Sequence, residues 1–280
     1  MRAGPLRIIV LIKQVPETSN VRIDEATGTM VREGVECIIN PHDLYAIEAA
    51  LQLKEATQPP GRVTVLSLGP RRAEREIREA LAMGCDEGVL LSAPAFAGSD
   101  TWATSLALSC AIRRMRDFDL VICGVRATDG ETGQVGPGVA SFLDLPLATY
   151  VSRIVQCCAA QIEVECLLED GYETLRLPLP CVLTVVKEIA FPRLPTLRGK
   201  QRARAQVVPV WGPAEIGLAP GEVGLAGSPT RVVKVTRPKA TRDGTVVNAD
   251  KAGVQVAVRQ LVDYLAEHGA VGNGRREGAA

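Results

Sequence analysis

The residues whose types and spacing could do chemistry lie in one stretch, VICGVRATDGETGQVGP at positions 121–137. Its first residues are apolar without polar alternation, as in a strand buried on both faces of a parallel sheet. Gly124 ends this run, and polar side chains then alternate with glycines up to Gly138. Glycines let a backbone approach a ligand closely, and free N–H groups at the start of a following helix favour phosphate. The stretch therefore predicts a nucleotide-phosphate-binding loop, and an ordinary turn is the alternative.

The composition argues against several other kinds of site. The 32 basic and 32 acidic residues cancel and only 4% of residues are aromatic, which disfavours a nucleic-acid surface. His42 and His268 are the only histidines, too few for a His-based triad or zinc site. The eight cysteines form no C-x-x-C pair and mostly lie in apolar segments, so we expect reduced, buried thiols. The sequence predicts neither a metal site nor a nucleophile–base pair.

The N-terminus carries no sign of a targeting segment. Its apolar run is broken by Arg7 and soon followed by Lys13, and is too short for a signal-peptide core. No stretch approaches the roughly 18 apolar residues of a membrane-spanning helix. We therefore expect a soluble, cytoplasmic protein with no membrane span.

Alternating strands and helices must position the loop. The predicted strands cover 7–12, 62–68, 88–92 and 120–123. The predicted helices start at Pro41 after an N-cap at Asn40, cover 71–83, run from Ser99 or Asp100 to Met115, and cover 136–143. This alternation predicts an α/β fold with a doubly wound, mostly parallel, Rossmann-like sheet.

The predicted topology brings the ends of several elements to one edge of the sheet. Lys13, Gly69 and Gly124 end strands there, and the helix after Asn40 starts there, where open α/β proteins bind their ligands. No G-x-G-x-x-G follows the first strand and no G-x-x-x-x-G-K-[ST] occurs. Neither a standard dinucleotide fingerprint nor a P-loop is therefore present.

The remaining segments read as additions to this sheet. Residues 16–34 predict a β-hairpin with Thr27 and Gly28 in its turn. After Tyr150, the runs VSRIVQ, IEVECLLE and ETLRLPLPCVLTVV predict antiparallel strands added at the sheet's edge. The nucleotide-binding α/β domain is thus expected to cover residues 1–190.

The chain loses its periodicity at Phe191. Long irregular stretches in compact domains usually have a function, so we expect residues 191–235 to form an extended arm on another subunit; a disordered linker is the alternative. Residues 236–270 should carry a docking helix, with Val254, Val258, Leu261 and Leu265 on one stripe. The tail 271–280 is expected to be disordered.

Several long motifs, in the same order along nearly the whole chain, resemble the β subunit of electron transfer flavoproteins. They are IKQVPET at 12–18, INPHDLYAIEAALQLKE at 39–55, DGETGQVGPGVA at 129–140, LEDGYETLRLPLPCVLTVVKEI at 168–189 and PRLPTLRGK at 192–200. The KQVP stretch and GLAGSPTRVVK at 224–234 resemble most the branch that includes FixA-like and electron-bifurcating members.

This resemblance implies a heterodimer with an α subunit that holds most of one flavin. That flavin would take electrons from an acyl-CoA dehydrogenase or another dehydrogenase and pass them to a quinone oxidoreductase, or to ferredoxin or flavodoxin. In ordinary members the β subunit holds a structural AMP. In bifurcating members the same site holds the ADP half of an FAD that NADH reduces, and the branch motifs favour FAD here.

The resemblance also implies which residues contact the nucleotide. They are Leu11, Lys13, Asn40, Pro41, His42, Asp43, Leu68, Val125, Arg126, Ala127, Thr128, Asp129, Gly130, Glu131, Thr132, Gly133, Gln134, Val135 and Gly136. Leu197 falls where the family carries a leucine that recognises the dehydrogenase; packing on the α subunit is the alternative. Cys166, Val125 and Glu131 depart from the usual family residues, and Val125 puts one phosphate or flavin contact in doubt.

Two other functions compete with electron transfer. A stand-alone adenine-nucleotide-binding module would share the site but would not explain the long segment after Phe191. An adenylating or ATP-hydrolysing enzyme is disfavoured because the chain lacks a phosphate-activating motif.

Overall fold

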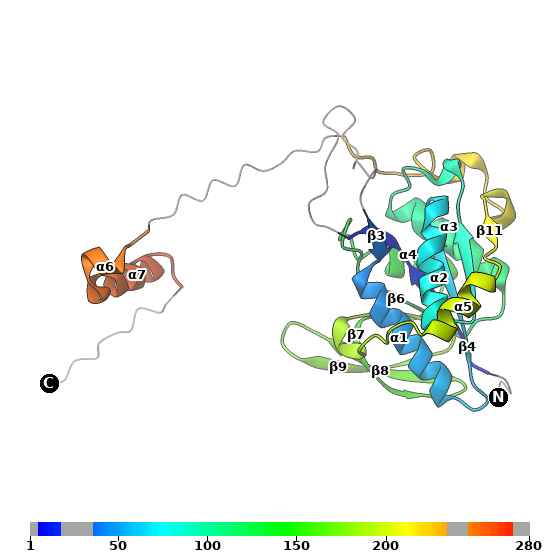
Figure 1. Cartoon of the computed structure of the whole chain (residues 1–280), viewed down its shortest axis with the longest axis horizontal. Helices are drawn as coiled ribbons and strands as arrows, with labels where there is room; N and C mark the ends of the chain where they lie inside the picture. Colours follow the sequence, from blue (N-terminus) through cyan, green and yellow to red (C-terminus); the bar gives the residue numbers. More distant parts are fainter. Residues whose placement is uncertain (1–4, 18–35, 234–245, 271–280) are drawn as a thin grey trace. The chain divides into compact units, whose positions relative to one another are not determined.

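The structure, a computed structural model, describes residues 5–17, 36–233 and 246–270. The chain divides into two units, 1–235 and 236–280. The strands and helices are labelled as in Figure 1.

Within the described residues, the first unit contains a nine-stranded sheet in the order β11-β5-β4-β1-β6-β10-β7-β8-β9. Its strands are β1 (Arg7–Ile12), β4 (Arg62–Leu68), β5 (Glu87–Leu91), β6 (Leu120–Gly124), β7 (Leu147–Cys157), β8 (Gln161–Leu167), β9 (Tyr172–Pro178), β10 (Cys181–Val185) and β11 (Val210–Trp211). All neighbours from β11 to β7 pair in parallel, and β7, β8 and β9 pair antiparallel. The predicted mixed, mostly parallel sheet is confirmed.

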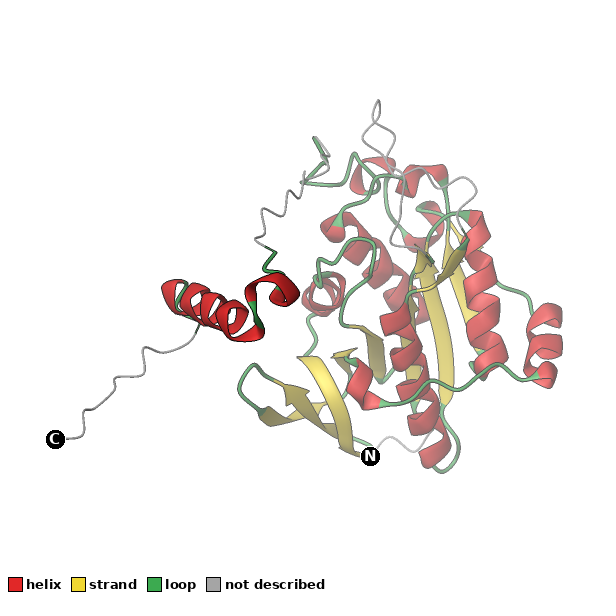
Figure 2. Cartoon of the chain, turned by 60° about the vertical axis from the view of Figure 1, so that its left-hand side comes forward, coloured by secondary structure: helices red, strands yellow, loops and turns green. Residues whose placement is uncertain are grey.

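Helices cover both faces of this sheet (Figure 2). They are α1 (Pro41–Ala56), α2 (Glu74–Met83), α3 (Thr101–Met115), α4 (Val135–Leu143) and α5 (Leu197–Ala205). Strand β1 shows why the sheet needs both layers. Ile8 and Val10 pack in one core cluster with residues of α1 and α2, whereas Ile9 and Leu11 pack in another with residues of α3 and α4. Alternate residues of a strand face opposite sides of the sheet, so a strand that is apolar throughout must be covered on both faces. The doubly wound architecture is confirmed.

One part of the predicted edge is wrong. The run ETLRLPLPCVLTVV is not a single antiparallel strand: β9 is antiparallel to β8, but β10 lies inside the sheet, parallel to β6 and β7. Pro178 and Pro180 separate the two strands, because proline cannot donate to a ladder. Cys181–Val185 is buried at every position, as an interior parallel strand requires.

The predicted hairpin over 16–34 falls largely outside the described residues. The short strands β2 (Gln14–Pro16) and β3 (Cys37–Ile39) that flank it pair antiparallel. Short 3-10 turns also occur at Arg71–Ala73, Pro94–Phe96, Lys187–Ile189, Ala214–Ile216 and Pro220–Glu222.

Residues 191–233 return across their own domain and contain regular elements. Helix α5 lies alongside α2 (Figure 1), and β11 adds a parallel strand to β5. Val223 is buried, and Gly224 donates its backbone N–H to Ser99 Oγ. These contacts lie within the first unit, and the expected contact of residues 191–235 with another subunit stays a prediction.

In the second unit, the docking helix expected within 236–270 is divided in two. Helix α6 (Ala249–Ala252) and helix α7 (Val254–Glu267) meet at Gly253, whose φ of +80° cannot continue a helix. Val254, Val258 and Leu261 are exposed on α7. The predicted docking of this helix is untested, and the tail 271–280 lies outside the described residues. None of the described helices is both long and apolar enough to cross a membrane.

Candidate functional site

Asn40 ties the start of α1 to the polar loop. It precedes the helix, as predicted, but its side chain makes no cap bond to that helix. Instead, its Nδ2 donates to Arg126 O at 2.9 Å, and its Oδ1 accepts the backbone N–H of Thr128 at 3.2 Å. Asn40 is almost fully buried, so both bonds are shielded from water. The side chain fixes the first residues of the loop rather than the helix.

Asp43, one turn further along α1, ties together the ends of two strands. Its carboxyl oxygens accept the backbone N–H of Lys13 at 2.8 Å and of Gly124 at 3.2 Å. Burial raises the pKa of Asp43 to about 7, although these hydrogen bonds favour the charged form. Gly124 is required for the approach, because an added Cβ would lie 2.6 Å from Asp43 Oδ1 and 2.7 Å from the His42 carbonyl carbon.

The loop has a backbone conformation suited to an anion. Glu131 and Gly133 have φ values of +51° and +63°, and Gln134, which follows, is right-handed. Alternating left- and right-handed residues turn consecutive N–H groups toward one point, where they can bind an anion. Glu131 is a bulky residue at positive φ, a strained conformation that is common at functional sites.

Helix α4 begins where the loop ends. Its first N–H groups, at Val135 and Gly136, have no acceptor within the helix, so they can bind phosphate. A Cβ at Gly136 would lie 2.5 Å from Thr184 Cγ2 and 2.9 Å from Cys123 Sγ. The absence of a side chain therefore seats the helix start directly on β6 and β10.

Two titratable side chains stand beside this anion-binding backbone. Lys13 Nζ is 2.6 Å from Asp129 Oδ1; the lysine side chain is half-exposed and the carboxylate nearly buried. Burial and the nearby Arg126 charge lower the pKa of His42, which keeps its imidazole neutral at pH 7. The His42 Nδ1 atom is buried without a hydrogen-bond partner. An adenine nucleotide fits this set: the cation and the N–H groups suit its phosphates, and the imidazole nitrogen could take a ligand hydrogen bond.

Polar residues at the start of α3 form a wall beside the loop, which was not predicted from the sequence. Thr101 Oγ1 donates to Gln134 Oε1 at 3.2 Å. Asp100 caps α3 and also accepts two hydrogen bonds from Thr230, at 3.0 and 2.7 Å. Ser228 Oγ accepts the Asp100 backbone N–H at 2.9 Å. No local pattern announces such bonds, since the partners are about 130 residues apart in sequence.

The structure brings most of the predicted nucleotide residues to this edge, but in different roles. Arg126, Thr128, Gly130, Glu131, Thr132, Gln134 and Pro41 are exposed, and Ala127, Asp129, Gly133 and Val135 are partly so. Leu11 and Leu68 are strand residues that pack in or against the apolar core. Val125, directly after β6, is buried, with its N–H bonded to Val185 O. Leu197 is not at this edge, because it starts α5, which packs on α2.

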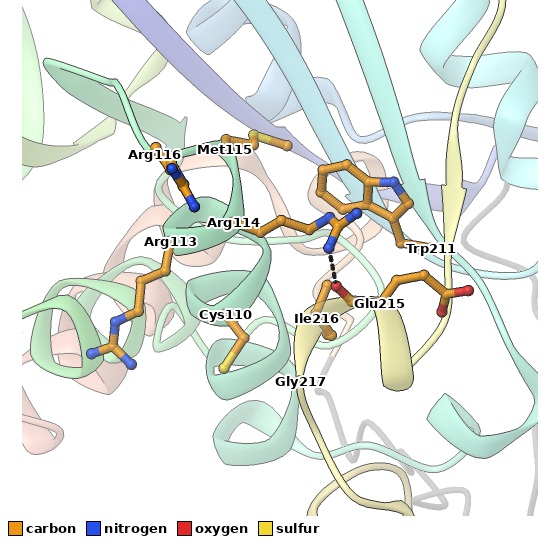
Figure 3. Close-up of a pocket in the computed structure, with 9 residues that line it drawn as sticks. All are labelled: Cys110, Arg113, Arg114, Met115, Arg116, Trp211, Glu215, Ile216 and Gly217. Atoms are coloured by element: carbon orange, nitrogen blue, oxygen red, sulfur yellow. Dashed lines mark hydrogen bonds between the residues drawn. The ribbon is translucent and has the colours of Figure 1, made fainter.

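A separate groove of about 740 Å³ lies between the end of α3 and residues 211–217 (Figure 3). Arg114 donates to Glu215 O at 2.7 Å, and its guanidinium lies 4.9 Å from the centre of the Trp211 ring. None of the predicted nucleotide residues lines this groove. It does not compete with the loop as the nucleotide site.

Comparison with known proteins places these observations in context. The family model described as "Electron transfer flavoprotein domain" matches residues 27–216. The chain is 45% identical over 261 residues to an electron transfer flavoprotein subunit beta of Thermoanaerobacterium thermosaccharolyticum, covering 93% of this chain and 98% of the relative. It is 45% identical over 263 residues to the caffeyl-CoA reductase-Etf complex subunit CarD of Acetobacterium woodii, covering 94% and 98%. It is 40% identical over 268 residues to protein FixA of Azotobacter vinelandii, covering 93% and 95%.

Proposed function

The chain belongs to the β-subunit and FixA branch of the electron transfer flavoprotein family and is an electron-carrier subunit; from this premise we propose that its polar loop holds an FAD that NADH reduces. The flavin, when bound, supplies the electron transfer. The protein's part is to bind the cofactor, orient it and present it to partners.

We propose further that the chain works as a heterodimer with an α subunit. The name of one relative, a subunit of a caffeyl-CoA reductase-Etf complex, supports a multi-subunit assembly. The dehydrogenase and the final acceptor are proposed from the family: an acyl-CoA or other dehydrogenase, and a quinone oxidoreductase, ferredoxin or flavodoxin. No disulfide bond joins the eight cysteines, all of which lie within the described residues. We propose a cytoplasmic location, where thiols stay reduced.

The observation that carries the nucleotide site is a set of buried hydrogen bonds from two side chains at the start of α1. Asn40 holds the start of the loop and Asp43 holds the ends of β1 and β6. Buried polar side chains that satisfy backbone groups fix those groups before a ligand arrives. We propose that the first N–H groups of α4, which have no acceptor within the helix, bind a phosphate there.

FAD rather than AMP is supported by the wall beside the loop. The branch motif 224–234 lies partly in that wall, where Ser228 and Thr230 bond to Asp100. Thr101, the next residue, bonds to Gln134 of the loop. A dinucleotide extends beyond its AMP half and needs such additional surface, whereas AMP alone does not.

The proposal is tested by co-expressing the full chain with the α chain of the same organism. The cofactors are released from the purified heterodimer by acid and counted by chromatography and absorbance. Two FAD per heterodimer and no AMP are expected, and anaerobic NADH should bleach the flavin absorbance.

One FAD and one AMP per heterodimer, with no bleaching by NADH, would leave the electron-carrier function intact and contradict the FAD assignment. A colourless chain that does not assemble with α would contradict the whole proposal and favour a stand-alone nucleotide-binding module.

A further inference from the structure

The groove between the end of α3 and residues 211–217 has the size and the lining of a small-molecule site. Its volume of about 740 Å³ lies within the range of about 300–1,000 Å³ that is usual for such sites. Met115, Trp211 and Ile216 give it apolar walls. Arginines at positions 113, 114 and 116 also line it, in the last turn of α3 and directly after it.

Arg114 is held in place across this groove (Figure 3). Its guanidinium donates to Glu215 O at 2.7 Å and lies 4.9 Å from the centre of the Trp211 ring. The ring and the carbonyl together fix the plane of the guanidinium. A guanidinium has five N–H donors, of which the Glu215 carbonyl takes one. A planar donor set that is fixed in advance suits the oxygen atoms of a phosphate, which it can bind in a forked geometry.

Arg116 is exposed, and its backbone is strained. Its φ of +64° and ψ of −87° are close to the rare classic γ-turn, which glycine adopts more readily than a residue with a side chain. Strain of this kind is typical of functional positions. In the part of the chain that the structure describes, no hydrogen bond or ion pair engages the Arg116 guanidinium, and the adjacent Asp117 pairs with Arg7 at 2.7 Å. The guanidinium is therefore available to a ligand.

The dipole of α3 does not account for this arrangement. Basic residues are common in the last turn of a helix because they complement its dipole. That effect explains why arginines occur at the end of α3, but it does not explain where their guanidinium groups lie. Arg113 donates to Phe142 O of α4, and Arg114 donates to Glu215 O, so neither bonds to a carbonyl of α3 itself.

The charges of the lining favour a dianion. Glu215 is the acidic residue of the lining, but its carboxylate accepts the Gly212 N–H at 2.9 Å and points away from Arg114 (Figure 3). Arg114 and Arg116 bring two positive charges that no carboxylate of the described residues neutralises. These two charges exceed the roughly half negative charge of a helix end. A phosphate ester carries nearly two negative charges above its second pKa of about 6.

We propose that this groove is a binding site for a small organic phosphate, with Arg114 and Arg116 as the residues that contact the phosphate group. Arg114 binds it through the free N–H groups of its fixed guanidinium, and Arg116 binds it from the end of α3. Met115 and Ile216 contact the organic group. The site is separate from the nucleotide loop, so the proposal is the same whether that loop holds FAD or AMP.

The test uses the full chain as the flavin-loaded heterodimer, in which the loop is occupied, and phenyl phosphate as the probe. Isothermal titration at pH 8 measures its Kd beside those of phenyl sulfate and inorganic phosphate. Phenyl sulfate has the same shape but a single negative charge, and inorganic phosphate has the charge but no apolar group. We expect saturable binding of phenyl phosphate, about 10-fold tighter than that of either of the other two.

Two positions are then varied. Arg114→Gln should raise Kd for phenyl phosphate about 10-fold, and Arg114→Lys should raise it less, because lysine keeps the charge without the planar donor set. Arg116→Gly should raise Kd about 5-fold and also raise the melting temperature, because glycine relieves the strained backbone while the contact is lost. A purely structural role of Arg116 would not combine these two changes.

Arg113→Gln is the matched control. It removes a positive charge from the same turn of α3, but the Arg113 guanidinium is bonded to Phe142 O of α4. Kd for phenyl phosphate should therefore change less than about 2-fold. Circular dichroism and flavin content check that each variant is folded and loaded.

Three results would overturn the proposal. One is the absence of saturable binding of phenyl phosphate to the wild type, or equally tight binding of phenyl sulfate. Another is a wild-type Kd in Arg116→Gly and in Arg114→Gln, which would mean that phosphate binds elsewhere. The third is an equal rise of Kd in Arg113→Gln, which would reduce the effect to net charge. A failure of the proposed function would instead appear as absent flavin.

Discussion

Helix α1 contacts two regions that are built in opposite ways. At its first turn, Asn40 and Asp43 turn polar side chains inward to hold backbone groups of the loop and of β1 and β6. In its second half, Glu48 and Glu55 hold Arg193, and the neighbouring apolar side chains point outward.

The difference shows which groups are left free for function. In the loop, side chains are used for the scaffold and backbone N–H groups remain available, which suits a small anionic ligand. In residues 191–197, charged side chains form the scaffold and apolar side chains remain available, which suits a protein surface. A substitution in one region should therefore leave the function of the other region unchanged. Each of the substitutions below would contradict this if it affected both regions.

The largest effect is expected for Gly124→Ala. The added Cβ would fall within 2.7 Å of Asp43 Oδ1 and of the His42 backbone, so α1 must shift. We expect the free energy of unfolding to fall by about 3 kcal/mol, as for overpacked cores, together with loss of the nucleotide.

Gly130→Ala is its control, since an added Cβ there meets nothing within 4 Å. Thermal unfolding followed by circular dichroism measures both variants. Equal melting temperatures for the two would contradict the close approach of α1 to β6.

Gly199→Ala should damage the other region. The Cβ would press on Ala82 O at 2.1 Å and move α5 away from α2. We expect a loss of about 2 kcal/mol in unfolding free energy and a raised KM for the dehydrogenase, with normal flavin content. Gly221→Ala, where an added Cβ has open space, is the control. A loss of flavin in Gly199→Ala would show that the two regions are not separable.

Asn40→Ala should weaken nucleotide binding without affecting docking. Two hydrogen bonds to the loop are lost, each worth about 1 kcal/mol, so Kd for the β-site nucleotide should rise roughly 30-fold. Isothermal titration of the nucleotide-free heterodimer measures it. Asn248→Ala, which removes a helix cap in the second unit, should leave Kd unchanged.

The smallest effect is a pH dependence of opposite sign in the two regions. The pKa of Asp43 is raised to about 7, so between pH 4 and 7 the folded chain binds more protons than the unfolded chain. Its contribution to stability therefore falls as pH rises, by about 1 kcal/mol from pH 6 to 7, and is constant above the folded pKa.

Glu48 behaves in the opposite way. Arg193 holds its pKa below the usual value, so its contribution is present above the unfolded pKa and is lost as pH falls through the folded pKa. Unfolding of Asp43→Asn and Glu48→Gln between pH 3 and 8, each compared with the wild type, separates the two. Differences of the same sign in both variants would contradict the assignment.

Local patterns in the sequence were enough to predict the elements that hold the loop. The strands 7–12 and 62–68 are found with the predicted bounds, and the 88–92 strand is displaced by one residue. The 7–12 strand carries a continuous apolar run after Arg7, the other two strands are rich in Val and Leu, and proline or glycine marks where several helices stop. The glycine-rich loop was recognisable because its composition differs so sharply from the buried strand before it.

What the sequence could not reveal are pairings between distant residues. The interior position of β10 depends on β6, about 60 residues earlier in the chain. Asn40 reads as a helix cap because that is its usual local role, yet its partners are 86 and 88 residues away. Arg193 pairs with Glu55 and Glu48, which lie 138 and 145 positions away in sequence. The sequence around Arg193 therefore shows only a basic stretch without periodicity.

The most direct test of the central claim measures the adenine nucleotide, FAD and AMP together, that acid releases from the purified heterodimer. The wild type and Arg193→Gln should release equal amounts, and Asn40→Ala should release one equivalent less per heterodimer. Equal release from all three would show that the loop held by Asn40 is not the nucleotide site.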